Sequence, residues 1–137
     1  MATTNFEKLE VYRLSERLAD HIWDIVLRWD SFARDTIGKQ MVRAVDSVGA
    51  NISEGVGRSS YKDNQRFIRT ARGSLYETKH WLRRAYRRRL LSREEVAALK
   101  PLVDELSPRL NAYLNAIRAL DAQHQHRKDR ENEEPRP

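Results

Sequence analysis

Apolar side chains recur every three to four residues through most of this chain, the spacing that places them on one face of an α-helix. Four segments have this pattern, and they predict helices over residues 7–30, 35–54, 60–89 and 92–120. The apolar positions predicted to face a common core are Val11, Leu14, Leu18, Ile22, Ile25 and Trp29; Ile37, Met41, Ala44, Val45, Val48 and Ile52; Phe67, Ile68, Ala71, Leu75, Leu82 and Ala85; and Val96, Leu99, Val103, Leu106, Leu110, Tyr113, Leu114 and Ile117.

The ends of the first two predicted helices have sequence signals of their own. Residues 31–34 read as a short connection. We expect the second helix to stop at Gly55 and Gly57, because glycine readily adopts the left-handed conformation that ends helices.

The fourth predicted helix begins at a capping box. Ser92 and Glu95 can each satisfy a free backbone amide of its first turn. Pro101 and Pro108 each lack a backbone donor and clash with the preceding turn, so we expect a kink or break there.

Four amphipathic helices with short connections predict an all-α fold, an antiparallel up-down four-helix bundle. We assign residues 1–6 to an N-terminal extension and residues 7–120 to the bundle. Residues 121–137 contain little that could anchor a core, so we expect a disordered charged tail.

Composition narrows the functional class. The chain has 137 residues and no cysteine, which excludes disulfides, thiolate metal sites and cysteine nucleophiles. It shows no signal-peptide pattern and no apolar run long enough to span a membrane. We therefore expect a cytoplasmic protein with no membrane partner.

Positive charge is concentrated in one part of the chain. Between Arg58 and Arg93 stand twelve basic and two acidic residues, a net charge of +10 in a chain whose total is +6. On a helical wheel, eight of these cations fall within about 140° of one another, along roughly 38 Å of the third helix. Tyr76 and His80 lie in the same stripe. We predict a nucleic-acid interface formed by Lys62, Arg66, Arg69, Arg72, Tyr76, Lys79, His80, Arg83, Arg84 and Arg87.

Three interpretations of this basic stripe are open. It could be a solvated helix face, but a solvated face normally mixes charges, because like charges at i,i+4 oppose the helix. It could bind a polyanion, and the excess of arginine over lysine suits bidentate phosphate contacts. It could also dock an acidic protein surface. We favour RNA or DNA, with Tyr76 and His80 available to stack on bases.

Two motifs are more specific than the charge. Residues 40–55 and 67–78 contain Gln40, Arg43, Ala44, Ser47, Asn51, Ile52, Glu54 and Gly55, and then Phe67, Ala71, Gly73, Ser74 and Glu77. In residue type and spacing this pattern resembles the bacterial four-helix-bundle family of 23S rRNA intervening-sequence proteins. The resemblance covers about residues 5–120.

The resemblance implies a homo-oligomer, described in related members as a homopentamer. A related branch consists of accessory proteins of diversity-generating retroelements, in which a basic pentamer is thought to hold a reverse transcriptase and RNA. A reverse transcriptase is therefore a further expected partner.

The motif residues of the second helix also have a structural interpretation. Gln40, Arg43, Ser47, Asn51 and Glu54 lie within about 80° of one another beside the apolar face. We expect a hydrogen-bonded polar seam that includes Glu77, with Arg43 able to pair with Glu54 or Glu77. Gly73 and Ser74 would let a neighbouring helix approach closely. A ligand site built from the same residues is the alternative.

Some large apolar residues fall away from the predicted core faces. They are Leu9, Trp23, Leu27, Val42 and Trp81. Such residues often become buried against another subunit, so we predict that they contribute to an oligomer interface.

No pattern of residues indicates catalysis. Residues 55–58 are only a fragment of a glycine-rich loop. Asp20, His21 and Asp24 lack a serine at a sharp turn, and His124 and His126 lack a third metal ligand. We expect no enzyme activity, no metal and no cofactor. The sequence thus predicts a non-enzymatic nucleic-acid-binding bundle, with a protein-interaction scaffold as the alternative.

Overall fold

The computed structural model describes Phe6 and residues 9–133. Within them the chain forms α1 (Glu10–Leu27), the single turn α2 (Ser31–Ala33), the π-helix η2 (Arg34–Gly38), α3 (Lys39–Val56), α4 (Tyr61–Arg87) and α5 (Arg93–Glu133). The described part contains no strand. Most of the predicted N-terminal extension, the first residues of the first predicted helix and residues 134–137 of the predicted tail lie outside the described residues.

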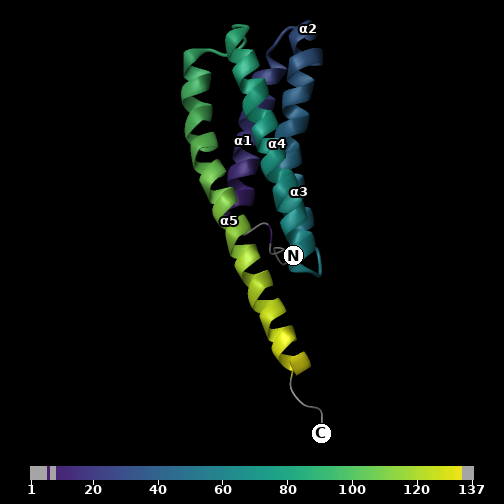
Figure 1. Ribbon diagram of the computed structural model, residues 1–137. Helices are drawn as coiled ribbons and strands as arrows, with labels where there is room; N and C mark the ends of the chain where they lie inside the picture. Colours follow the sequence, from purple (N-terminus) through teal and green to yellow (C-terminus); the bar gives the residue numbers. More distant parts are fainter. Residues whose placement is uncertain (1–5, 7–8, 134–137) are drawn as a thin grey trace, which may run out of the picture.

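The four long helices run alternately up and down the molecule (Figure 1). α1 packs against α3 and α5, and α4 packs against the same two helices. α1 and α4 are therefore diagonal to each other. This arrangement confirms the predicted all-α four-helix bundle.

The core is formed by the predicted apolar faces. Leu18, Ile22, Val45, Ile68 and Leu106 are fully inaccessible to solvent. Complete burial of such a side chain contributes about 1.5–3 kcal/mol, so these faces supply most of the stability of the bundle. Trp29, Phe67, Leu82, Val96, Val103 and Tyr113 were also predicted to face the core, and they are only partly buried at its edge.

The connection after α1 is shorter than predicted. Residues 31–34 do not form a loop, because helix resumes at Ser31 and continues through η2 into α3. The Asp30 carboxylate accepts a hydrogen bond from the Ala33 amide at 3.0 Å and so caps the new helix. A Cβ on Gly38 would lie 2.7 Å from Val26 Cγ1, so the π-turn brings this backbone against α1.

The end of α3 is where the sequence predicts it, but the mechanism differs. α3 ends at Val56, and Gly57 has a φ of −74°, in the right-handed region. No described glycine has a positive φ. The left-handed residue is instead Arg89, with φ of 61°, at the end of α4.

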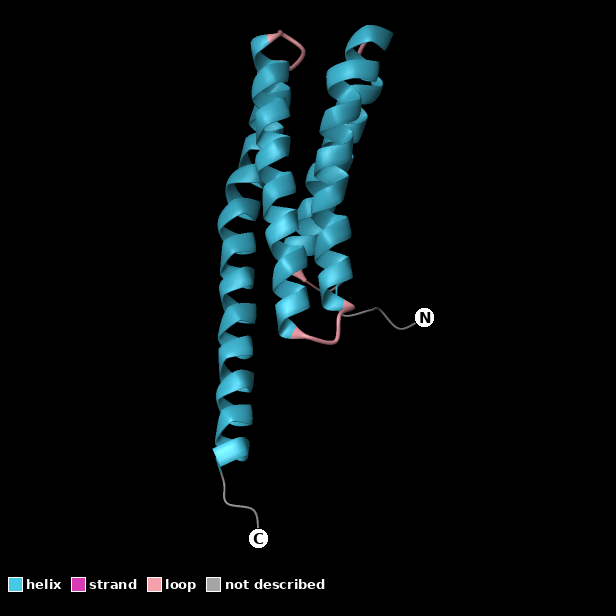
Figure 2. Ribbon diagram, turned by 45° about the vertical axis from the view of Figure 1, so that its right-hand side comes forward, coloured by secondary structure: helices cyan, strands magenta, loops and turns pink. Residues whose placement is uncertain are grey.

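α5 differs from the prediction in its continuity and its length. Neither Pro101 nor Pro108 breaks the helix, which is curved along its length (Figure 1). Helix also continues to Glu133, where a disordered tail was predicted from residue 121. Good helix formers and the 3.1 Å bond from Gln125 Nε2 to Asp129 Oδ1 support this extension. It projects beyond the ends of the other helices (Figure 2), and its side chains are exposed from residue 122 onward.

The predicted capping box is present. The Ser92 amide donates to Glu95 Oε1 at 2.8 Å, and the Glu95 amide donates to Ser92 Oγ at 3.1 Å. α4 has its own cap, because the Asp63 amide donates to Ser60 Oγ at 3.1 Å. These two caps fix the residues at which α4 and α5 begin.

Candidate nucleic-acid interface

The predicted basic stripe lies on α4. Its apolar side is held against α3 and α5 by Ile68, Ala71, Leu75 and Ala85, all of which are buried. The opposite side is therefore turned outward. All ten predicted interface residues are at least partly exposed: Lys62, Arg66, Arg69, Tyr76, His80, Arg83 and Arg87 are exposed, and Arg72, Lys79 and Arg84 are half-buried.

The N-terminal half of the stripe is partly satisfied within the molecule. Arg66 pairs with Asp63 at 3.3 Å, and its guanidinium lies 4.5 Å from the centre of the Phe67 ring. Arg69 Nη2 donates to Gln65 Oε1 at 3.1 Å. Gln65 in turn donates to Asp121 Oδ2 of α5 at 3.0 Å. The Asp63 carboxylate compensates the charge of Arg66, whereas the neutral Gln65 holds Arg69 in place without reducing its charge.

The middle of the stripe borders α5. Arg72 Nη1 donates to Asn111 Oδ1 at 3.4 Å, and Lys79 Nζ donates to Ser107 Oγ at 3.0 Å. Both partners are neutral, so both cations keep their charge uncompensated. The contacts hold the two side chains in place beside the neighbouring helix.

The C-terminal half of the stripe is the least compensated. Among the described residues, the side chains of Arg83, Arg84 and Arg87 form no ion pair or hydrogen bond with the protein. Arg84 and Arg87 lie in the last turn of α4, where the carbonyl ends of the helix favour positive charge. A phosphate group approaching here would meet arginines without competing carboxylates.

Three further cations at the α4–α5 turn were not predicted as interface residues. Arg88, Arg89 and Arg93 are exposed and directly follow the stripe. The sequence contains a signal for them, since arginine fills five of the seven positions from 83 to 89. Helical-wheel reasoning missed them because Arg88 and Arg89 fall outside the roughly 140° stripe of a helix continued to residue 89, and Arg93 lies beyond that helix.

Both aromatic residues of the stripe are exposed. Tyr76 is 54% exposed, with Lys79 Nζ lying 5.4 Å from its ring centre. The His80 ring meets Trp81 edge-on, with ring centres 4.8 Å apart. Both exposed rings therefore have a neighbour, the ammonium of Lys79 over the Tyr76 ring and the edge-on Trp81 ring beside His80.

The predicted polar seam is shorter in the structure. Asn51 Nδ2 donates to the carbonyl oxygen of Ser47 at 2.8 Å and to Ser47 Oγ at 3.0 Å. Ser74 Oγ of α4 donates to Ser47 Oγ at 3.0 Å and so links α4 to α3. Gln40 and Glu77 are exposed to solvent and lie outside this cluster.

Two details of the seam prediction are wrong. Glu54 pairs with Arg58 at 2.7 Å, and within the described chain the exposed Arg43 forms no ion pair with Glu54 or Glu77. Gly73 does not permit close helix approach, since a Cβ there would meet nothing within 4 Å. Close approach occurs at Gly55 instead, where a Cβ would lie 3.1 Å from Phe67 Cβ.

The residues predicted for an oligomer interface fall into separate places. Trp23 and Leu27 are 52% and 54% exposed, and with Val42 they line a hollow of about 470 Å³ between α1 and α3. Leu9 and Trp81 are half-buried and pack against the edge of the core.

The described residues contain no group of three or more side chains that could hold a metal ion. His124 contacts the Tyr61 ring, with ring centres 5.9 Å apart. Within the same residues, no helix combines the length and apolar character needed to cross a membrane.

Comparison with known proteins places this chain in a family. Residues 7–112 match the family described as 23S rRNA-intervening sequence protein. A crystal structure of a protein of unknown function from Bacteroides thetaiotaomicron, assigned to the S23 ribosomal protein family, is similar in fold, with a TM-score of 0.70 and 24% sequence identity. The match covers 77% of this chain and 95% of that one. No curated protein matches. With most of its helical bundle matched, this chain belongs to the 23S rRNA-intervening sequence protein family.

Proposed function

We propose that this protein is a non-enzymatic nucleic-acid-binding bundle that holds the backbone of RNA or DNA on α4. The observation that carries the proposal is the uncompensated arginine cluster formed by Arg83, Arg84, Arg87, Arg88, Arg89 and Arg93 at the α4–α5 hairpin. The family name, which refers to an intervening sequence in 23S rRNA, favours RNA as the ligand.

Arginine is suited to this role because its planar guanidinium can make two parallel hydrogen bonds to one phosphate. Most of the affinity would come from phosphate neutralisation, which is weakly sequence-specific and falls steeply with salt. Tyr76 adds an exposed aromatic ring on which an unpaired base could stack.

The protein is also proposed to act as a homo-oligomer, with the pentamer of related proteins as the expected size. The exposed side chains of Trp23 and Leu27 support this, because they place large apolar surface beside the hollow that Val42 also lines. This surface lies on α1 and α3, and α1 is diagonal to α4, so self-association there would leave the arginine cluster accessible. A role as accessory factor to a reverse transcriptase belongs to the same proposal.

The experiment measures binding of a labelled structured RNA and a random DNA duplex across a salt series, with particle mass recorded on the same samples. We expect a steep loss of affinity with salt for both ligands. Reversing two charges in Arg83→Glu/Arg87→Glu should lower the salt slope by about two and weaken binding at least tenfold. The matched control, Arg17→Glu/Arg109→Glu, changes the same charge at exposed positions of α1 and α5, outside both the stripe and the α1–α3 hollow, and should weaken binding much less.

Equal losses in both double variants would show a response to net charge alone and would contradict an α4 interface. Absence of binding at low salt would overturn nucleic-acid binding and favour the docking of an acidic protein. Trp23→Glu should dissociate the oligomer, and an unchanged mass would exclude the proposed α1–α3 contact.

A further inference from the structure

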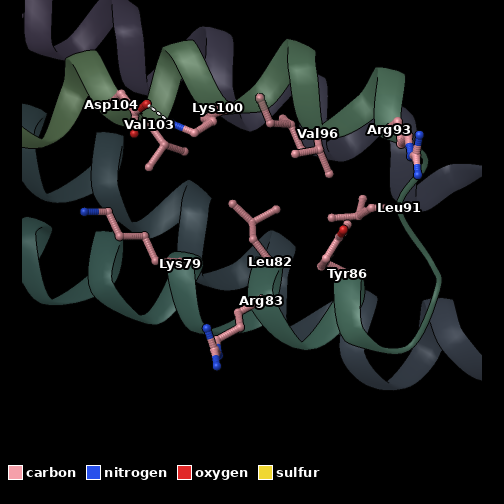
Figure 3. A pocket seen from close by; sticks show the side chains of 11 residues that line it. Lys79, Leu82, Arg83, Tyr86, Leu91, Arg93, Val96, Lys100, Val103 and Asp104 are labelled. Atoms are coloured by element: carbon pink, nitrogen blue, oxygen red, sulfur yellow. Dashed lines mark hydrogen bonds and ion pairs between the residues drawn. The ribbon is translucent and has the colours of Figure 1, made fainter.

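A groove runs between the upper parts of α4 and α5, next to the hairpin that joins them (Figure 3). Its volume is about 590 Å³. Leu82 points into it from α4, and Val96 and Val103 point toward Leu82 from α5. Leu91 and Tyr86 close the end next to the hairpin. The groove is separate from the seam between α3 and α4 and from the hollow between α1 and α3.

The bottom of the groove is apolar surface that the bundle leaves in contact with water. Leu91 and Leu99 are buried beneath it, whereas Leu82, Val96 and Val103 are half-buried and Tyr86 is 57% exposed. Covering these side chains would remove apolar surface from water, which favours binding. The groove therefore favours an occupant that has an apolar face of its own.

The rim of the groove is positively charged. Arg83 and Arg93 are exposed, and within the described chain their side chains form no ion pair. Lys79 donates only to the neutral Ser107. The single acid, Asp104, is neutralised by Lys100 at 2.6 Å. An occupant with carboxylates beside its apolar face would complement both the floor and the rim.

The length of the groove suits a helix. Its α5 side runs from Arg93 to Asp104, which at 1.5 Å per residue is roughly 16 Å, or three helical turns. The exposed end of α5 cannot supply this guest, because over residues 118–133 its only large aliphatic side chain is Leu120 and its acidic and basic residues balance.

We propose that this groove docks an amphipathic acidic helix of a partner protein, with the apolar face of that helix on Leu82, Val96 and Val103 and its carboxylates toward Arg83 and Arg93. The mode is a helix laid in a groove between two helices. The inference does not depend on the proposed nucleic-acid function, because a chain that ignores RNA could still bind this partner.

The test uses the full chain and a labelled peptide of about 14 residues, with leucine at i, i+3, i+7 and i+10 and glutamate on both flanks. Fluorescence anisotropy measures its affinity. Two variants address the floor and the rim separately. Tyr86→Ala removes an apolar side chain that lines the groove, and the fold should tolerate it because Tyr86 is mostly exposed. Arg93→Glu reverses a charge on the rim at the first residue of α5, a position where an acidic side chain stabilises the helix. Arg118→Glu is the matched control on the same helix, outside the groove.

We expect each groove variant to weaken peptide binding at least about fivefold and the control to leave it unchanged. A scrambled peptide of the same composition should bind at least about tenfold more weakly, because its leucines no longer share a face. The proposal would be overturned if the scrambled peptide, or a peptide with lysine in place of glutamate, bound as tightly as the original peptide. It would also be overturned if both groove variants bound the original peptide as tightly as wild type does. A change in particle mass caused by Tyr86→Ala would assign the groove to a second copy of this chain instead.

Discussion

The indole Nε1 of Trp29 donates a hydrogen bond to the backbone carbonyl oxygen of Leu90 at 3.0 Å. Trp29 lies in the turn after α1, and Leu90 lies in the turn between α4 and α5, 61 residues later. The bond therefore ties together two turns at the same end of the bundle, where the arginine cluster is located. It fixes the hairpin that carries Arg88, Arg89 and Arg93.

Replacing Trp29 by phenylalanine keeps an aromatic ring and removes the donor. We expect Trp29→Phe to lower the free energy of unfolding by about 1 kcal/mol, the typical loss for one hydrogen bond. Chemical denaturation measures the change. Trp81→Phe is the control, because Trp81 is half-buried like Trp29 and its Nε1 has no hydrogen-bond partner among the described residues, so this change should lower the free energy of unfolding by less than Trp29→Phe does. Equal effects at both positions would show that the Leu90 contact adds no stability.

Among the described non-glycine residues, Arg89 alone has a positive φ, at 61°. The Leu90 amide donates to the Ala85 carbonyl at 2.9 Å and the Arg89 amide donates to that of Tyr86 at 3.1 Å, the two bonds of a Schellman motif. Glycine adopts this conformation without steric strain, so Arg89→Gly should raise the free energy of unfolding by about 1 kcal/mol. Arg88→Gly, at a φ of −91°, should give no such gain. A destabilised Arg89→Gly protein would mean that the arginine side chain itself stabilises the turn.

Asp46 gives the stability a defined dependence on pH. Partial desolvation of its carboxylate, although the side chain stays accessible to solvent, and then the nearby Asp20 carboxylate raise the pKa of Asp46 above its usual 3.8. The folded protein thus holds this proton more tightly than the unfolded chain, so ionised Asp46 lowers stability at neutral pH. Asp46→Asn should stabilise the protein at pH 7. That gain should fade as the pH falls through the raised pKa and should vanish below 3.8.

Thermal unfolding of wild type and Asp46→Asn at several pH values checks this expectation. Asp24→Asn, at an exposed acid outside the Asp20–Asp46 cleft, serves as the control. A gain that persists unchanged at pH 3 would show that removal of the charge is not its cause.

The projecting end of α5 should contribute little to stability. Its side chains are exposed from residue 122 onward, and residues 126–133 form no hydrogen bond or ion pair with another helix of the described chain. Deleting residues 126–137 should change the free energy of unfolding by less than about 0.5 kcal/mol. Leu114→Ala, by contrast, should cost about 2–5 kcal/mol, because Leu114 is buried in the core. Urea denaturation distinguishes the two, and a large loss on truncation would show that the projecting end packs against the bundle.

Much of the fold could be predicted from sequence, because apolar periodicity along a helix maps directly onto the buried face. Met41, Val48 and Ile52 were placed correctly for this reason. The charge pattern likewise placed the basic stripe on the exposed side of α4. The pattern could not tell which cations have partners, since Arg66 meets a local acid whereas Arg83 meets none.

Periodicity and charge along the chain by themselves determined the four helices, their buried faces and the location of the positive charge, because each depends on residues close in sequence. The tertiary structure decided which helices are neighbours, and this determined where the groove between Leu82 and Val96 lies. It also decided that Arg89, rather than a glycine, takes the left-handed position, and that Trp29 reaches Leu90. Contacts between residues distant along the chain depend on how the helices pack, and the helical pattern contains no record of that packing.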